Sequence, residues 1–247
     1  MQAVILLAGY GSRLGRDDLA HKSFLPFGNE TLLSRHLKSL QALGVAKAVL
    51  VLGHNHDAVR DYALGLNLDL PLEFIDNKVY RTTGNTLSLV LGLKRTDQDV
   101  VILDGDVYYP QETFLDYVER SHANSFAVVS ADINDAECAK VLLKDNGVIS
   151  AFITKRLLTE QEKTDYKFGG EAIGFFKLNR EAASRFTEMY YANEAAYEKT
   201  LWEIPFSDFA QSNEIHFWAI DQPGCFEIDT AEDYQEALDW SQAHPGV

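Results

Sequence analysis

Two neighbouring segments of the sequence carry residues of the types that bind phosphates. Residues 8–14 (AGYGSRL) follow an apolar run, and their two glycines allow a sharp turn that presents backbone N–H groups to an anion beside Arg13. Lys22 follows at short range in HKSFLPFG, where its ammonium can reach the same phosphates. Because a glycine turn alone is equally an ordinary strand-to-helix connection, it is the combination with Lys22 that predicts phosphate binding.

Two acidic segments far apart in the sequence are candidates for binding a divalent metal. The apolar run 100–103 ends in Asp104-Gly105-Asp106, and carboxylates at the carboxyl end of a central parallel strand face the crevice in which open α/β sheets bind ligands. Mg²⁺ takes one or two carboxylates together with phosphates and waters. Asp106 is therefore a candidate metal ligand, whereas Asp104 could equally be a structural turn residue. Asp229, in FEIDTAEDY, by itself fits best as the N-cap of the helix that follows.

The pair LLAGYGSRL and KSFLPFG resembles the signature of the sugar-nucleotidyltransferase-like (MobA-like NTP transferase) superfamily, in which LAAGxGxRL precedes PKxLxP. His21 stands where that family generally has proline, which alters how the following lysine is held but leaves it present. The resemblance implies an Mg²⁺-dependent nucleotidyltransferase in which this lysine stabilises the charge that develops at the α-phosphorus. The residues that it implies for nucleotide binding are Leu7, Ala8, Gly9, Gly11, Ser12, Arg13 and Lys22.

The C-terminal segment FEIDTAEDY resembles the EIDxxEDY element of cytidylyltransferases in this superfamily, whose first aspartate completes the metal site. By that resemblance the metal ligands are Asp106 and Asp229. Glu227, Glu232 and Asp233 are then expected to be surface or capping residues.

The segment TGNTLSL (83–89) resembles the (G)NxxSL segment of headgroup cytidylyltransferases, which make CDP-choline, CDP-inositol or CDP-aminoethylphosphonate type products. The hexose 1-phosphate enzymes have GTAxAL instead, so CTP is favoured over UTP, dTTP or GTP. Asn85, which alone could be a simple helix cap, can offer a donor and an acceptor to a base edge or a ribose. The further nucleotide-binding candidates are Asn85, Thr86, Ser88 and Asp104.

The resemblance is weakest from residue 156 to residue 215, where acceptor specificity usually lies. Tyr197 and Glu198, with neighbouring aromatic residues, would suit a cationic ammonium headgroup, although such aromatic stripes are more often core. Lys140 and Lys155, at the ends of two expected strands, are either ligands of the acceptor phosphate or solvated surface lysines. The glycine pair before Glu171 is either a turn or part of an acceptor contact.

The elements that must position these residues alternate between strands and helices in the first half and change to a hairpin after residue 106. Such alternation favours a parallel sheet covered by helices. We expect a Rossmann-like three-layer α/β/α fold with a mixed, mainly parallel central sheet and a small antiparallel extension, as one domain (1–247) with a nucleotide-binding half (1–106) and an acceptor-binding half (107–247). The expected strands are 4–7, 48–52, 72–75, 100–103, 126–131, 140–143, 148–154 and 217–220, and the expected helices are 32–43, 56–64, 86–94, 180–191 and 231–241.

Composition narrows the classes of partner. The 37 acidic against 22 basic side chains give a formal charge of -15, which repels polyanions and argues against nucleic-acid binding. Cys138 and Cys225 have no metal-ligand spacing, so we expect reduced cysteines in the cytoplasm. The apolar run 3–8 is too short for a membrane span and does not resemble a signal peptide, so we expect no membrane contact. A homodimer stays open.

Together the sequence predicts transfer of CMP from CTP to a small phosphate- or phosphonate-bearing acceptor, with release of pyrophosphate. A cationic amine headgroup, as in phosphocholine or aminoethylphosphonate, is the expected acceptor feature. The predicted catalytic residues are Lys22, Arg13, Asp106 and Asp229, with Mg²⁺ as cofactor. One alternative is a sugar-1-phosphate nucleotidyltransferase that uses UTP, dTTP or GTP, and a second is a non-catalytic, nucleotide-binding regulatory protein.

Overall fold

The computed structural model describes residues 1–16 and 18–245, apart from the side chain of Ser12. One mixed, nine-stranded sheet runs through these residues in the order β10-β9-β11-β6-β1-β4-β5, with β8 paired to β11 and β12 paired to β8. Four strands of the first half form its parallel part. These are β1 (Gln2–Leu7), β4 (Ala48–Leu52), β5 (Leu72–Asp76) and β6 (Val100–Asp104).

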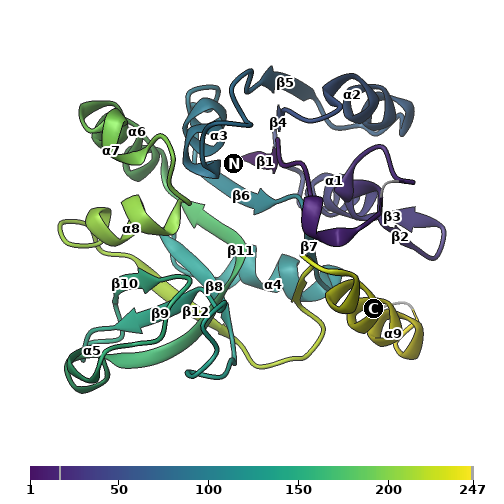
Figure 1. The fold of residues 1–247 in the computed structure, drawn as a ribbon. Coiled ribbons are helices and arrows are strands. Elements are labelled where there is room, and N and C mark those ends of the chain that lie inside the picture. The colour runs from purple at the N-terminus through teal and green to yellow at the C-terminus, as the bar shows by residue number, and fades with distance from the viewer. Residues whose placement is uncertain (17, 246–247) are drawn as a thin grey trace.

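Helices cover both faces of this parallel part, as the alternation of apolar side chains in β1 requires. Val4 faces a core cluster that contains Leu89 of α3, whereas Ile5 faces a cluster that contains Leu37 of α1 and Tyr117 of α4. The expected three layers are therefore confirmed (Figure 1). The covering helices are α1 (Leu32–Ala42), α2 (His56–Gly65), α3 (Asn85–Leu93), α4 (Gln111–Arg120) and α6 (Arg180–Ala192).

The second half adds strands to the same sheet through β11 (Lys167–Leu178), which pairs antiparallel with β6, β8 and β9, while β12 pairs parallel with β8. Residues 1–106 and 107–247 thus share one continuous sheet. The other strands of this part are β8 (Ser125–Val129), β9 (Lys140–Leu143), β10 (Ile149–Ile153) and β12 (His216–Ile220).

Strand β11 corrects one expectation from the sequence. The glycine pair Gly169-Gly170 lies inside this strand, so the turn interpretation of this segment is wrong. A Cβ atom on Gly170 would lie 2.2 Å from the carbonyl oxygen of Val129 in β8, and the backbone at Gly170 has a φ of 120°. Glycine is needed here because β8 approaches the backbone closely at a point where the pairing of β11 with β9 is irregular.

Short elements bring the C-terminus to the N-terminal loop. The hydroxyl of Tyr234 in α9 donates to the carbonyl oxygen of Pro26 at 2.7 Å, and Ala237 packs in one apolar cluster with Phe27. None of the helices in the described part of the chain has the length and apolarity needed to cross a membrane. The remaining elements are η1 (Ser12–Leu14), η2 (Lys22–Phe24), β2 (Pro26–Phe27), β3 (Glu30–Thr31), β7 (Val107–Tyr108), α5 (Glu160–Asp165), α7 (Glu194–Tyr197), α8 (Glu203–Phe209), β13 (Phe226–Glu227) and α9 (Ala231–Ala243).

Candidate active site

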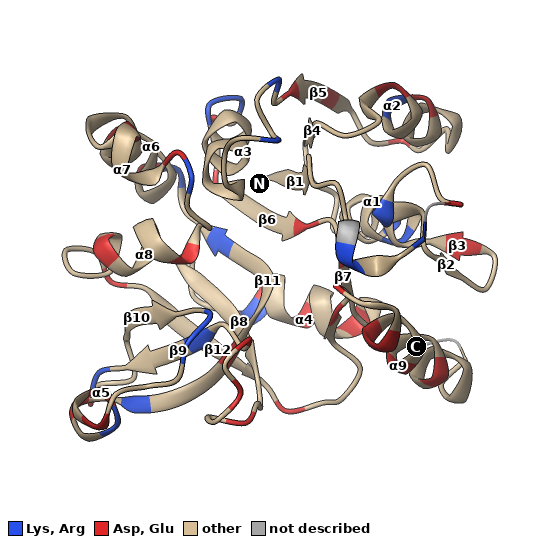
Figure 2. Cartoon of the chain, in the orientation of Figure 1, with Lys and Arg blue, Asp and Glu red and all other residues tan. Residues whose placement is uncertain are grey.

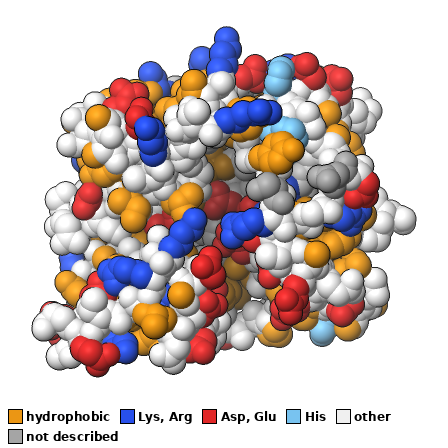
Figure 3. Space-filling view, viewed as in Figure 1, with side chains coloured by type: hydrophobic (Ala, Val, Ile, Leu, Met, Phe, Trp, Pro, Cys, Tyr) orange, Lys and Arg blue, Asp and Glu red, His pale blue; other side chains and the backbone are white. Residues whose placement is uncertain are grey.

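A cleft of about 950 Å³ opens at the carboxyl ends of β1 and β6. One wall consists of the loop after β1, the start of α3 and the segment before α9, and the other consists of β11, the end of β10 and the start of α8. Acidic positions gather at the end of β6 and along α9 (Figure 2), and acidic side chains occupy the centre of the hollow in the space-filling view (Figure 3). We call the wall that contains the loop after β1 the nucleotide wall and the wall that contains β11 the acceptor wall, after the roles that the sequence predicts for them.

A charged cluster on the nucleotide wall joins the four predicted catalytic residues in the order Asp106, Lys22, Asp229, Arg13. The Nζ atom of Lys22 donates to Asp106 Oδ2 at 2.9 Å and to Asp229 Oδ1 at 2.8 Å. Arg13 donates to Asp229 Oδ2 at 2.7 Å. Burial opposes the charge on Lys22, but the two carboxylates outweigh it and raise the pKa of the ammonium. The same two cations overcome the effect of burial on Asp229 and lower the pKa of its carboxyl group.

The loop after β1 fixes the position of this lysine. Gly11 has a φ of 66°, and a Cβ atom there would lie 3.1 Å from Cβ of Lys22, so the glycine backbone packs against the lysine stem. His21 ties the segment to β1, since its Nε2 atom lies 3.0 Å from the carbonyl oxygen of Leu7 and its Nδ1 atom accepts from the backbone N–H of Ser23. Burial lowers the pKa of His21 to about 4, so the ring is neutral. His21 thus holds the segment that carries Lys22 against β1, at the position where the family generally has proline.

The segment before α9 carries two carboxylates into the cleft. Thr230 is the N-cap of α9 and forms a capping box with Asp233, which leaves the carboxylate of Asp229 for the charged cluster. The N-cap interpretation of Asp229 is therefore wrong, and the capping role of Asp233 is confirmed. Carboxylate oxygens of Asp106, Glu227 and Asp229 all lie within 4.8 Å of one another.

Glu227 is the residue of this group that the sequence analysis missed. It is exposed, as expected of a surface residue, but it lines the same cleft as Asp229. The signal present in the sequence was its place two residues before Asp229 in the same motif. Three carboxylates at this spacing fit the oxygen ligands that Mg²⁺ prefers.

The beginning of α3 ties the two walls together. The backbone N–H of Gly84 donates to the carbonyl oxygen of Glu198 at 2.8 Å, and the Oδ1 atom of Asn85 accepts from the backbone N–H of Trp202 at 2.8 Å. The indole N–H of Trp202 in turn donates to Asp104 Oδ2 at 3.1 Å. Burial and the carboxylates of neighbouring residues raise the pKa of Asp104 well above its usual value. Asp104 and Asn85 thus line the cleft and also hold the acceptor wall in place.

The other nucleotide-binding candidates divide into two groups. Thr86 is buried and donates to the carbonyl oxygen of Thr200, so its hydroxyl supports the loop before α8 and does not line the cleft. Ser88 lines the cleft but accepts from the side chain of Asn77 at 3.0 Å. The side chain of Ser12 lies outside the described part of the structure. Among the predicted residues at the end of β1 and in the loop that follows it, Leu7, Ala8, Gly9 and Gly11 line the cleft.

The candidates for acceptor binding are likewise only partly brought together. Lys155 and Glu171 line the cleft. Lys140 does not, because its side chain is buried and its ammonium donates to backbone carbonyl oxygens of residues 135, 138 and 156. Tyr197 packs in the core and donates to Asp208 at 2.7 Å, and neither Tyr197 nor Glu198 is among the residues that line the cleft. The structure therefore does not place a Tyr197–Glu198 cation box at the cleft.

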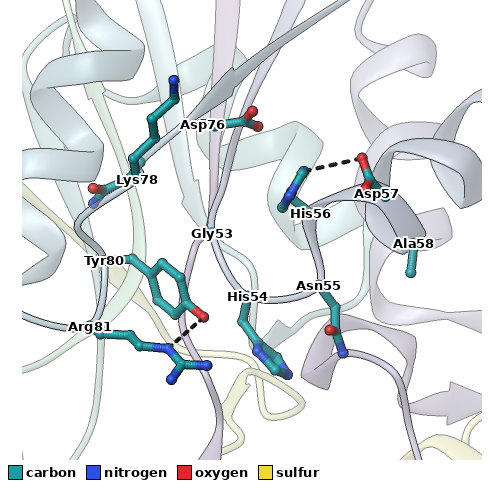
Figure 4. Close-up of a pocket in the computed structure, with 11 residues that line it drawn as sticks. Gly53, His54, Asn55, His56, Asp57, Ala58, Asp76, Lys78, Tyr80 and Arg81 are labelled. Carbon is teal, nitrogen blue, oxygen red and sulfur yellow. Dashed lines mark hydrogen bonds and ion pairs between the residues drawn. The ribbon is translucent and has the colours of Figure 1, made fainter.

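A second hollow of about 600 Å³ adjoins the nucleotide wall at the carboxyl ends of β4 and β5 (Figure 4). It shares Asn77 and Tyr80 with the main cleft. His54 and Tyr80 project into it from the loops that follow these two strands, and Arg81 donates to the hydroxyl of Tyr80 at 3.0 Å. Tyr10 stacks edge-on against His54, with ring centroids 4.4 Å apart. This end of the cleft is therefore its aromatic end.

Comparison with known proteins identifies similar sequences over much of the chain. Residues 3–174 match the family described as the MobA-like NTP transferase domain. A CMP-5'-(3-aminopropyl)phosphonate synthase from Streptomyces rubellomurinus is 31% identical over 157 residues, which is 63% of this chain and 25% of that protein. The bifunctional protein GlmU of Rippkaea orientalis is 27% identical over 177 residues, 67% of this chain and 37% of that protein. The chain thus spans well under half the length of these relatives.

Solved structures with the same fold cover nearly the whole chain. The CTP:phosphocholine cytidylyltransferase LicC from Streptococcus pneumoniae superposes with a TM-score of 0.73 at 17% identity, over 97% of this chain and 98% of that one. The inositol-1-phosphate CTP transferase from T. maritima gives a TM-score of 0.76 at 21% identity, over 100% and 97% of the two chains. At these identities the likeness establishes the fold.

Proposed function

Because this chain belongs to the MobA-like NTP transferase domain family, we propose that it transfers CMP from CTP to a small acceptor that carries a phosphonate or phosphate and an amine, with release of pyrophosphate. The observation that carries the proposal is the cluster in which Lys22 bridges Asp106 and Asp229 beside the glycine loop. This cluster combines a cation for phosphoryl oxygens with carboxylates for a metal, which are the two requirements of phosphoryl transfer.

The proposed reaction needs no side-chain nucleophile. An oxygen of the acceptor phosphonate attacks the α-phosphorus of CTP in line, a new P–O bond forms, and the bond to the bridging oxygen breaks so that pyrophosphate leaves with the electron pair. The acceptor oxygen is already anionic, so the protein contributes mainly position and charge stabilisation. Lys22 and Arg13 are the cations of the nucleotide wall that line the cleft in the described residues. We assign to Lys22 the stabilisation of charge at the α-phosphorus, and to Arg13 the binding of the triphosphate.

Asp106, Asp229 and Glu227 are the residues that would hold Mg²⁺. When bound, the ion supplies neutralisation of phosphate charge and alignment of the transferred group. Lys22 donates to two of the three carboxylates, so the ammonium and a divalent ion would share the same ligands. Binding of nucleotide phosphates is then expected to draw the ammonium toward the substrate.

The choice of CTP and of an aminoalkylphosphonate is supported by the TGNTLSL segment and by the relative named CMP-5'-(3-aminopropyl)phosphonate synthase, whose name contains CMP and an aminoalkylphosphonate. That similarity covers 63% of this chain. The matched family range, residues 3–174, includes the glycine loop, Lys22 and Asp106 but not Asp229. The acceptor wall adds Lys155 as a cation for the acceptor phosphonate.

The proposed function is tested by measuring pyrophosphate release across a matrix of four NTPs and five acceptors. The acceptors are 2-aminoethylphosphonate, phosphocholine, phosphoethanolamine, inositol phosphate and glucose 1-phosphate. We expect turnover with CTP and an amine-bearing acceptor, dependent on Mg²⁺. Faster release with UTP, dTTP or GTP and glucose 1-phosphate would replace the proposal with a sugar nucleotidyltransferase, and binding of CTP without release in any combination would indicate a regulatory protein.

A further inference from the structure

One buried carboxyl group on the acceptor wall is not used by the phosphate and metal chemistry described above. Glu203, the first residue of α8, is only 7% exposed, yet it lines the cleft. Its Oε2 atom has no hydrogen-bond partner among residues 1–16 and 18–245. Buried polar atoms are nearly always paired in folded proteins. An unpaired carboxyl oxygen at the edge of a ligand cleft is therefore available to a ligand.

Four other carboxylates of the cleft already have partners. Asp106 and Asp229 accept hydrogen bonds from Lys22, and Asp104 accepts one from the indole N–H of Trp202. Glu171, on the neighbouring strand β11, accepts from the backbone N–H of Ala139 at 3.3 Å. Among these groups, Glu203 is thus the one whose hydrogen bonding is incomplete.

The environment of Glu203 favours a cationic partner. Burial raises the pKa of this carboxyl group to about 7, while the nearby ammonium of Lys155 acts in the opposite direction. Asp104 and Glu227 also interact with it as like charges. A positive group bound at the free oxygen would favour the ionised carboxylate and relieve the repulsion among the acidic residues.

We propose that Glu203 selects acceptors that carry a primary ammonium group by accepting a hydrogen bond from it at Oε2. The inference rests on the proposed function and assigns the acceptor amine to a particular residue of that site. Trp202, which precedes Glu203 in the chain, is hydrogen-bonded to Asp104. Asp106 follows Asp104 by two residues. The amine site therefore lies beside the proposed site of phosphoryl transfer, as a short aminoalkyl chain requires.

The same geometry distinguishes a primary amine from a quaternary one. A quaternary ammonium has no N–H to donate and is bound mainly by exposed aromatic faces. Trp202 is the aromatic residue next to Glu203 in the cleft, and it is 2% exposed. The acceptor wall thus offers a hydrogen-bond acceptor and little aromatic surface.

The test compares three acceptors that share one phosphonate: 2-aminoethylphosphonate, its N,N,N-trimethyl derivative and ethylphosphonate. With saturating CTP, we expect kcat/KM of the wild type to be highest for the primary amine. Glu203→Gln keeps the shape of the side chain and removes its charge. We expect it to lower kcat/KM for 2-aminoethylphosphonate by about 10- to 100-fold, mainly through KM, because hydrogen bonds to charged groups have that strength. Values for ethylphosphonate and the KM for CTP should stay within about twofold of the wild type.

Two further variants make the result specific. Glu198→Gln removes a carboxylate outside the cleft and should leave the amine preference unchanged. Glu171→Gln removes the neighbouring carboxylate in the cleft, and loss of the amine preference in this variant but not in Glu203→Gln would overturn the proposal. Equal use of the primary and trimethylated amines by the wild type would also overturn it. If Glu203→Gln fails to fold, Glu203→Asp, which retains the charge on a shorter side chain, is expected to retain a weakened preference for the primary amine.

Failure of the proposed function is distinguishable from failure of this inference. Absence of pyrophosphate release with every acceptor contradicts the transferase activity, whereas turnover without an amine preference contradicts only the role of Glu203. Calorimetric titration of the same three acceptors into the wild type and Glu203→Gln requires no turnover. We expect a preference for 2-aminoethylphosphonate that the variant loses, and equal affinities for the two proteins would overturn the role of Glu203 whether or not the enzyme turns over.

Discussion

The two walls of the cleft differ in how their charged groups are satisfied. On the nucleotide wall, Lys22 and Arg13 complete the bonding of Asp106 and Asp229 within the protein itself. On the acceptor wall, Glu203 is buried with an oxygen that has no partner in the described part of the chain. Asp106 and Asp229 are already paired with cations of the protein, in an arrangement suited to phosphoryl transfer. Glu203, by contrast, would receive its partner from the substrate. The difference suggests that the first wall determines the reaction and the second determines the acceptor.

The walls also differ in how the chain builds them. The nucleotide wall comes from loops that directly follow β1 and β6, together with the segment before α9. The acceptor wall comes from β11, the end of β10 and the start of α8, which the loop 198–202 fastens to the start of α3. Variants on each wall, and at the fastening between them, can therefore separate turnover from acceptor choice.

The largest effect is expected from removal of a proposed metal ligand on the nucleotide wall. Asp106→Asn and Asp229→Asn should each lower kcat by at least about 100-fold, because each removes a negative charge that would hold Mg²⁺ against the phosphates. Pyrophosphate release at saturating substrates measures the loss, and thermal unfolding checks that the fold is retained. Glu232→Gln, on the exposed side of α9, is the matched control and should be unaffected. Near-normal turnover of a folded Asp106→Asn protein would remove Asp106 from the metal site.

Lys22→Ala should separate transition-state stabilisation from nucleotide binding on the same wall. We expect a loss of kcat of about 10- to 100-fold with a smaller change in the affinity for CTP, since the ammonium is assigned to the charge that develops at the α-phosphorus. Single-turnover kinetics together with CTP titration measure the two quantities. A loss confined to CTP affinity would reassign Lys22 to ground-state binding.

The sequence predicts the nucleotide wall well because its residues lie in short, contiguous motifs. Strand β1, the glycine loop and Lys22 are close together in the chain, so their local geometry follows from residue types and spacing. Asp106 is predicted from its place just after an apolar run, and Asp229 from the resemblance of FEIDTAEDY to the family's C-terminal element. Glu227 was not predicted because that resemblance assigns the metal to the aspartate and leaves the glutamate as a surface or capping residue.

The acceptor wall is harder to predict because it depends on pairing between distant segments. Gly169-Gly170 is typical of a turn until the close approach of β8 is known, and Lys140 is typical of a surface lysine until three carbonyl groups surround its ammonium. Tyr197 has the composition of a ligand box but packs in the core. Glu203 carries no motif, since its importance arises from burial, which tertiary packing alone determines.

A smaller effect is expected where the two walls are fastened together. A Cβ atom on Gly84 would lie 1.8 Å from the carbonyl oxygen of Thr200, and a backbone neighbour is hard to displace. We expect Gly84→Ala to lower the free energy of unfolding by about 1–3 kcal/mol and to raise KM for both substrates, because overpacking shifts the backbone that holds Trp202. Gly65→Ala, where nothing lies within 4 Å of the added Cβ, is the matched control. An unchanged denaturation midpoint and unchanged KM values in Gly84→Ala would show that the walls are not coupled through this contact.

The smallest effect that we predict is a dependence of stability on pH that originates in the attachment of the nucleotide wall. The folded protein lowers the pKa of His21 from 6.5 to about 4 by burial, so the unfolded chain binds a proton on this ring more readily than the folded one. This contribution to stability is fully present above about pH 6.5 and is lost as the pH falls toward 4, and it should amount to about 2 kcal/mol between pH 7 and pH 5. Urea unfolding at several pH values measures the slope. His21→Asn should be less stable than the wild type at pH 7, but its free energy of unfolding should decline less steeply as the pH falls. His36, whose pKa burial also lowers to about 4, should account for much of the pH dependence that remains. If the variant and the wild type lose stability in parallel between pH 7 and pH 5, the neutral His21 ring is not what ties Lys22 to β1.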